Sequence, residues 1–146
     1  MSRVGVVVTD TRVRPERLME AIAAAASDRG HVSLEVVIPV VLPDALPISA
    51  VPPRIAARAN ALLDQATASL EIAACPASAE IAPCRTIPRL LRELSPMDRL
   101  ILVGSAGWGV RRAARGVAAD VSVMSDRTRR PESRPRATGG VREVAG

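Results

Sequence analysis

Apolar residues occur along the chain in two alternating patterns. Stretches rich in apolar residues at positions 4–8, 32–42, 79–82, 100–103 and 121–124 predict strands. Residues 36–38 form the buried centre of the second, and residues 100–103 are an uninterrupted apolar run. The segment 70–74 competes with residues 79–82 as the third strand. Because continuous apolar runs are typical of strands buried on both faces, they favour a parallel sheet.

Segments with apolar residues at helical spacing separate these runs. They predict helices from Pro15 to just before Gly30, from about Pro53 to Leu70, over residues 87–94 and over residues 110–117. Thr86 can cap the third helix, and a loop with four prolines precedes the second. Strands that alternate with helices predict an α/β fold with right-handed crossovers.

Charge divides the chain into two parts. All 20 basic residues are arginines, but residues 1–126 are nearly neutral, whereas residues 127–146 hold six arginines and two glutamates. The latter segment lacks periodicity, so we predict one domain over residues 1–126 and a basic, disordered tail over residues 127–146. Nucleic acid or another polyanion is therefore expected as a partner only through the tail.

Other function classes find little support in the sequence. The longest apolar run is too short for a membrane span, and the start of the chain does not resemble a signal peptide. We therefore expect a cytoplasmic protein without a membrane partner, in which Cys75 and Cys84 are reduced thiols. The single His31 completes neither a catalytic group nor a metal site, so an enzyme is not predicted.

Three glycines follow the fourth predicted strand. Gly104, Gly107 and Gly109 separate that strand from an arginine-rich helix, an order that brings backbone N–H groups up to a phosphate. Arg111 and Arg112 could neutralise that phosphate. Alternatively, the glycines only permit a tight turn, Asp10 at the end of the first strand caps the first helix, and the arginines form a solvated helix face.

Trp108 is the single large ring of the chain and lies between two of these glycines. Two interpretations stay open for it. It can stack on a base or bury itself in a partner, or it can cover the aliphatic core.

The order of elements over residues 3–125 resembles the universal stress protein family. The resemblance lies in Asp10 closing the first strand, in the long second helix and in the run Asp98-Arg99-Leu100-Ile101-Leu102-Val103-Gly104. ATP-binding members carry a loop of Gly, two residues, Gly, nine residues, then Gly with Ser or Thr. Gly104 and Gly107 match its first half, whereas Gly116 stands one residue early and is followed by Val117.

The resemblance implies a flavodoxin-like, five-stranded parallel sheet in the order 3-2-1-4-5, with helices on both faces. It also implies a homodimer, for which residues 121–124 at the sheet edge are the expected contact. ATP or another adenine nucleotide would bind in the crevice between strands one and four. The expected binding residues are Asp10, Val37 and Ile38 near the adenosine, and Gly104, Gly107, Gly109, Arg111 and Arg112 near the phosphates.

Three hypotheses for function follow. The first is a small regulatory domain of the stress response that binds an adenine nucleotide weakly. The second is a degenerate member of the family that acts by protein–protein contact. The third is an adaptor that binds a polyanion through its arginine-rich tail.

Overall fold

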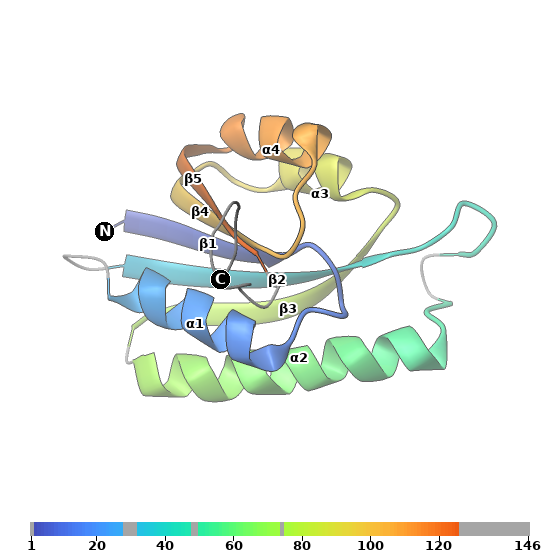
Figure 1. Ribbon diagram of the computed structural model, residues 1–146, viewed down its shortest axis with the longest axis horizontal. Coiled ribbons are helices and arrows are strands. Elements are labelled where there is room, and N and C mark those ends of the chain that lie inside the picture. Colours follow the sequence, from blue (N-terminus) through green and yellow to red (C-terminus); the bar gives the residue numbers. More distant parts are fainter. Residues whose placement is uncertain (1, 28–31, 48–49, 74, 126–146) are drawn as a thin grey trace, which may run out of the picture.

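The computed structural model describes residues 2–27, 32–47, 50–73 and 75–125. Strands and helices alternate along this part of the chain (Figure 1). They are β1 (Ser2–Val8), α1 (Pro15–Ala26), β2 (Val32–Val41), α2 (Pro53–Ala73), β3 (Ala77–Cys84), α3 (Ile87–Glu93), β4 (Met97–Val103), α4 (Trp108–Arg115) and β5 (Ala118–Met124). The predicted tail, residues 127–146, lies outside the described residues.

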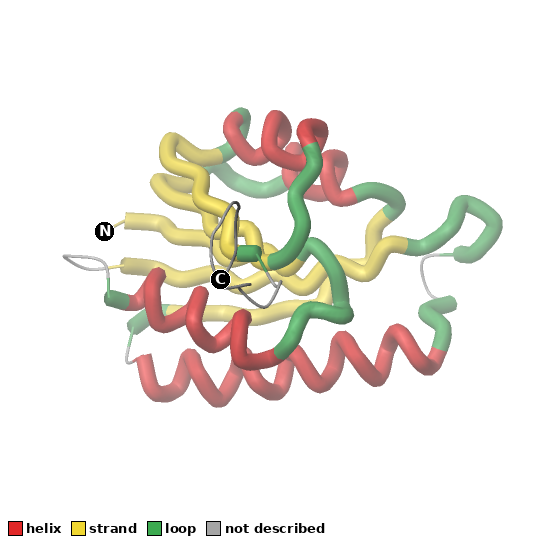
Figure 2. Tube along the Cα trace, viewed as in Figure 1, coloured by secondary structure: helices red, strands yellow, loops and turns green. Residues whose placement is uncertain are grey.

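The strands form one five-stranded sheet in the order β3-β2-β1-β4-β5, and all neighbours run parallel. This confirms the predicted fold class. Helices α1 and α2 cover one face of the sheet, and α3 and α4 cover the other (Figure 1). The loops that lead from the strands into the helices gather at the carboxyl edge of the sheet (Figure 2).

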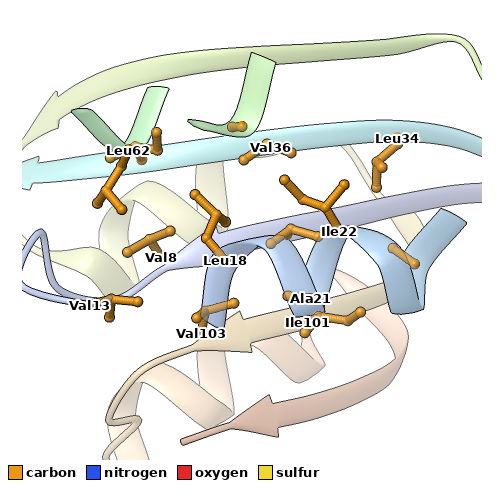
Figure 3. Close-up of a cluster of buried hydrophobic side chains, with 14 of the residues drawn as sticks. Val8, Val13, Leu18, Ala21, Ile22, Leu34, Val36, Leu62, Ile101 and Val103 are labelled. Atoms are coloured by element: carbon orange, nitrogen blue, oxygen red, sulfur yellow. The ribbon is translucent and has the colours of Figure 1, made fainter. Parts of the chain in front are cut away.

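Alternate side chains of each strand fill two separate cores. Val6 and Val8 of β1 point to the α1 and α2 side, where they pack with Leu18 and Ile22 of α1 (Figure 3). Val7 between them belongs to the cluster under α3 and α4. Because successive residues of a strand face opposite sides, a continuous apolar run supplies both cores at once.

Several element boundaries differ from the prediction, most clearly those of β3, α2 and α4. Strand β3 spans Ala77–Cys84, and the competing segment 70–74 continues α2 as far as its described end at Ala73. Helix α4 begins earlier, at Trp108. Gly116 and Val117 alone separate α4 from β5, so this crossover is short. Thr86 caps α3 as predicted, because its hydroxyl accepts a hydrogen bond from the Arg89 backbone N–H.

No helix among the described residues is both long enough and apolar enough to cross a membrane. The longest, α2, buries only the stripe of Ala59, Leu62 and Ala66 against the sheet.

Candidate site at the carboxyl edge of the sheet

The candidate site lies where β1 and β4 end side by side. Val8 of β1 pairs with Val103 of β4, so Asp10 and Gly104 follow neighbouring strand ends. The chain leaves this point in opposite directions, β1 into α1 below the sheet and β4 into α4 above it (Figure 1). In open α/β sheets, ligands bind outside the carboxyl ends of the strands at such a switch in direction. The predicted juxtaposition of Asp10 and Gly104 is therefore confirmed.

Gly104 is required by the backbone at this turn. Its φ is +117°, a conformation that residues with a Cβ rarely adopt. A Cβ at this position would also overlap Thr9 Oγ1 and would lie 3.0 Å from Val13 Cγ2. The Gly104 N–H donates to the Met124 carbonyl of β5 at 2.9 Å. Gly104 therefore shapes the turn, and its N–H is already used by the sheet.

Gly107 is the N-cap of α4 and has a different environment. Its φ of −74° suits any residue, and a Cβ there would meet no atom within 4 Å. Within the described part of the chain, the N–H groups of Ser105, Ala106 and Gly107 have no backbone acceptor. Open space above unpaired N–H groups at a helix start is the arrangement that binds anions.

Arg111 returns from α4 to the same loop. Its Nε donates to the Ala106 carbonyl at 2.8 Å, so its guanidinium lies beside the glycine turn. Gly109, the second residue of α4, has only Pro88 Cγ near a potential Cβ, at 3.9 Å, and lies toward α3. The structure thus brings Gly107 and Arg111 together and leaves Gly109 at the margin.

Asp10 is engaged by Arg12. Its Oδ1 accepts the Arg12 backbone N–H at 2.8 Å, and its Oδ2 accepts the Arg12 guanidinium at 3.0 Å. The hydrogen bond from the Arg12 side chain is the main reason that the pKa of Asp10 lies below its ordinary value, and Arg58 of α2 lowers it further. The alternative role of Asp10 as the α1 cap is wrong, because Arg14 is the N-cap and no side chain caps it.

Arginines gather around this edge, a feature that the sequence analysis did not find. The strand-to-helix loops and adjoining helix starts, at residues 9–17, 42–58, 85–89 and 104–111, hold three acids, Asp10, Glu16 and Asp44. They also hold eight arginines: Arg12, Arg14, Arg17, Arg54, Arg58, Arg85, Arg89 and Arg111. Three of these arginines form ion pairs, Arg12 with Asp10, Arg17 with Glu20 and Arg89 with Glu93. At the opposite edge Arg3 lies 3.7 Å from Glu35 and Arg99 lies 3.8 Å from Asp120. The carboxyl edge is therefore the cationic side of a nearly neutral domain.

Val37 and Ile38 do not belong to this site. Strand β2 continues to Val41, so both residues lie in its interior, 2% and 0% exposed. Their side chains enter opposite cores, and their backbones pair with β1 and β3 on either side. The structure therefore does not bring these two residues to the end of β2 beside Asp10, and the expected contact with an adenosine stays a prediction.

Arg112 also leaves the crevice. Its guanidinium lies 5.1 Å from the centre of the Trp108 ring, on the side of α4 that faces α3. Trp108 is 70% exposed, so it does not cover the core. Successive helical residues point about 100° apart, which explains why Arg111 and Arg112 diverge.

Neither cysteine adds catalytic chemistry. Burial raises the pKa of the Cys84 thiol, and Glu93 raises it further, which disfavours a reactive thiolate. Among the described residues, no group of three or more His, Cys, Asp or Glu side chains is placed to hold a metal ion.

Comparison with known proteins does not assign the chain to a family: no protein-family model matches it, and no curated protein matches it.

Proposed function

We propose that this domain binds an adenine nucleotide at the carboxyl edge between β1 and β4, and that it acts as a small regulatory protein of the universal stress protein type. The observation that carries the proposal is the open loop at residues 105–107, with its unpaired N–H groups beside Arg111. A negatively charged group is the ligand that such a loop favours.

The charged residues around the loop favour a ligand in which an anionic group is joined to a polar one. Arg12 forms an ion pair with Asp10, and Arg58 is close enough to lower the pKa of that carboxyl. In the proposed arrangement, phosphates occupy the space over Gly107 and the Arg111 guanidinium. Asp10 accepts hydrogen bonds from the ribose hydroxyls, and Arg12 must turn away to permit this.

The loop predicts weak binding. Gly104 uses its N–H within the sheet, and the chain has Gly116-Val117 where ATP-binding members of the family have Gly with Ser or Thr. Each missing neutral hydrogen bond costs about 0.5–1.5 kcal/mol, so two or three reduce affinity by roughly tenfold to a thousandfold. AMP and ADP should then bind nearly as well as ATP.

The test is a titration of the full chain with AMP, ADP and ATP, followed by calorimetry and by the emission of Trp108, the single tryptophan. Gly107→Val fills the open space at a backbone conformation that valine adopts easily, and should weaken binding at least tenfold. Asp10→Asn should weaken it as well. Asp44→Asn removes the same charge from the β2–α2 loop and serves as the matched control.

Two results would contradict the proposal. One is the absence of heat at millimolar nucleotide. The other is equal binding by the wild-type chain and the Gly107→Val variant, which would place the nucleotide elsewhere. Tight binding with a strong preference for ATP would show that the loop supplies more phosphate contacts than its sequence predicts.

We further propose that the regulatory form is a homodimer joined through β5. This strand ends the sheet, so one side of its backbone has no neighbour in the β3-β2-β1-β4-β5 order. Unpaired backbone groups at a sheet edge favour pairing with a second chain. Residues Val121 and Val123 are only partly buried and would gain cover from such a contact.

A further inference from the structure

A groove runs between α3 and α4, on the far side of α4 from the glycine loop. These two helices pack against each other on the same face of the sheet (Figure 1). The groove encloses about 470 Å³, a volume typical of ligand sites. Its lining residues are Arg92, Trp108, Gly109, Arg112, Ala113, Gly116 and Val117.

The polar side chains of the groove are all cationic or aromatic. Arg112 stacks over Trp108 with its guanidinium 5.1 Å from the ring centre, and Arg92 lines the groove from α3. The lining includes no carboxylate. Glu93, the neighbour of Arg92, lies 3.9 Å from Arg89 and lines a different cavity, beside Cys84. The charge of the groove is therefore complementary to an acidic group.

The exposure of Trp108 points to a macromolecular partner. A tryptophan that is 70% exposed, held in place by a stacked arginine, has a defined orientation without a buried role in the domain. Tryptophan and arginine are the residues that contribute most to protein interfaces. Ala113 and Val117 contribute apolar side chains to the lining of the groove, and Gly109 and Gly116 contribute no side chain to it.

The length of the groove favours an extended peptide. It follows α4 from Trp108 to Gly116, a distance of about 12 Å at the helical rise. An extended chain covers that distance in about four residues. Carboxylates on alternate positions lie on one face of an extended chain, so that single face would meet Arg92, Arg112 and the Trp108 ring.

We propose that the groove between α3 and α4 docks an acidic, extended segment of a partner protein, with Trp108, Arg92 and Arg112 as its anchors. The site is separate from the carboxyl-edge crevice, because Arg111 faces the glycine loop and Arg112 faces the groove. A nucleotide in the crevice and a peptide in the groove would contact opposite sides of the same short helix.

The experiment uses the full chain and a capped peptide of sequence Glu-Leu-Glu-Leu-Glu, with Gln-Leu-Gln-Leu-Gln as the uncharged probe. Binding is followed by calorimetry and by Trp108 emission, which the peptides do not share. We expect saturable binding of the acidic peptide that weakens as salt increases. Arg112→Glu and Arg92→Glu should each weaken it at least tenfold.

Arg115→Glu is the matched control, because it makes the same charge change on the exposed surface of α4 outside the groove. Because solvent screens this exposed charge, the substitution should change the affinity for the acidic peptide by less than about twofold. Circular dichroism of each variant verifies that α4 and the fold are intact.

Three outcomes would overturn the proposal. The first is the absence of saturable peptide binding up to a few millimolar. The second is an equal loss of affinity in the Arg115→Glu and Arg112→Glu variants, which would show that only the net charge of α4 matters. Equal binding of the uncharged peptide belongs here too, because it would show that binding is non-specific. The third is competition by ATP together with loss of ATP binding in Arg112→Glu, which would assign the groove to the nucleotide.

Discussion

Replacement of Gly104 by alanine should destabilise the protein by about 2–4 kcal/mol. A residue with a Cβ at positive φ costs on the order of 1–3 kcal/mol. The new Cβ would also overlap Thr9 Oγ1, which donates a hydrogen bond to the Val103 carbonyl at 3.2 Å. Rotation of Thr9 to relieve the overlap gives up that bond, worth roughly 0.5–1.5 kcal/mol.

A double-mutant cycle separates the two costs. In a Thr9→Ala background the overlapping oxygen is gone, so Gly104→Ala should cost less than in the wild-type chain, by about 1 kcal/mol or more. The cost that remains measures the strain at φ +117° together with the close contact at Val13 Cγ2. Gly107→Ala is the matched control, and because its Cβ would meet open space its free energy of unfolding should change by less than about 1 kcal/mol.

Urea unfolding followed by circular dichroism measures all four variants, and the slope of the transition verifies that each unfolds in the same way. A Gly104→Ala variant as stable as the wild-type chain would refute this reasoning. A Gly107→Ala variant that loses as much as Gly104→Ala would refute it too, since the two glycines would then be equivalent.

Two further predictions concern Asp10 and β5. Because the pKa of Asp10 lies below its ordinary value of 3.8, the Asp10–Arg12 pair should stabilise the fold above about pH 5, and that contribution should disappear as the pH falls through 4 and below. The pair is largely exposed, so Asp10→Asn should lower the free energy of unfolding by less than about 1 kcal/mol at pH 7, and an unchanged gap from the wild type at pH 2.5 in urea titrations would contradict this. Light scattering at micromolar concentration should give twice the chain mass, and Val123→Pro, which cannot pair at its backbone N–H, should weaken the dimer. A monomer mass for the wild-type chain would exclude the β5 contact.

The sequence by itself determined the fold and the place of its crevice. Apolar runs and helical spacing distinguish the central strands from the helices, because burial on both faces leaves few polar positions in β1 and β4. In a parallel sheet the carboxyl ends of all strands lie at one edge. Asp10 and Gly104 therefore had to lie side by side if β1 and β4 were neighbours. The resemblance to the universal stress protein family predicted that neighbour relation correctly.

Only the tertiary structure decided which side chains face the crevice. The alternation of β2 placed Val37 and Ile38 in two different cores, although a one-dimensional pattern makes them a single apolar run. Successive residues of a helix point about 100° apart, so Arg111 contacts the glycine loop and Arg112 contacts Trp108. The gathering of arginines at one edge joins four loops that are far apart in the chain. Direction and proximity of this kind depend on packing between distant segments, which no local pattern in the sequence records.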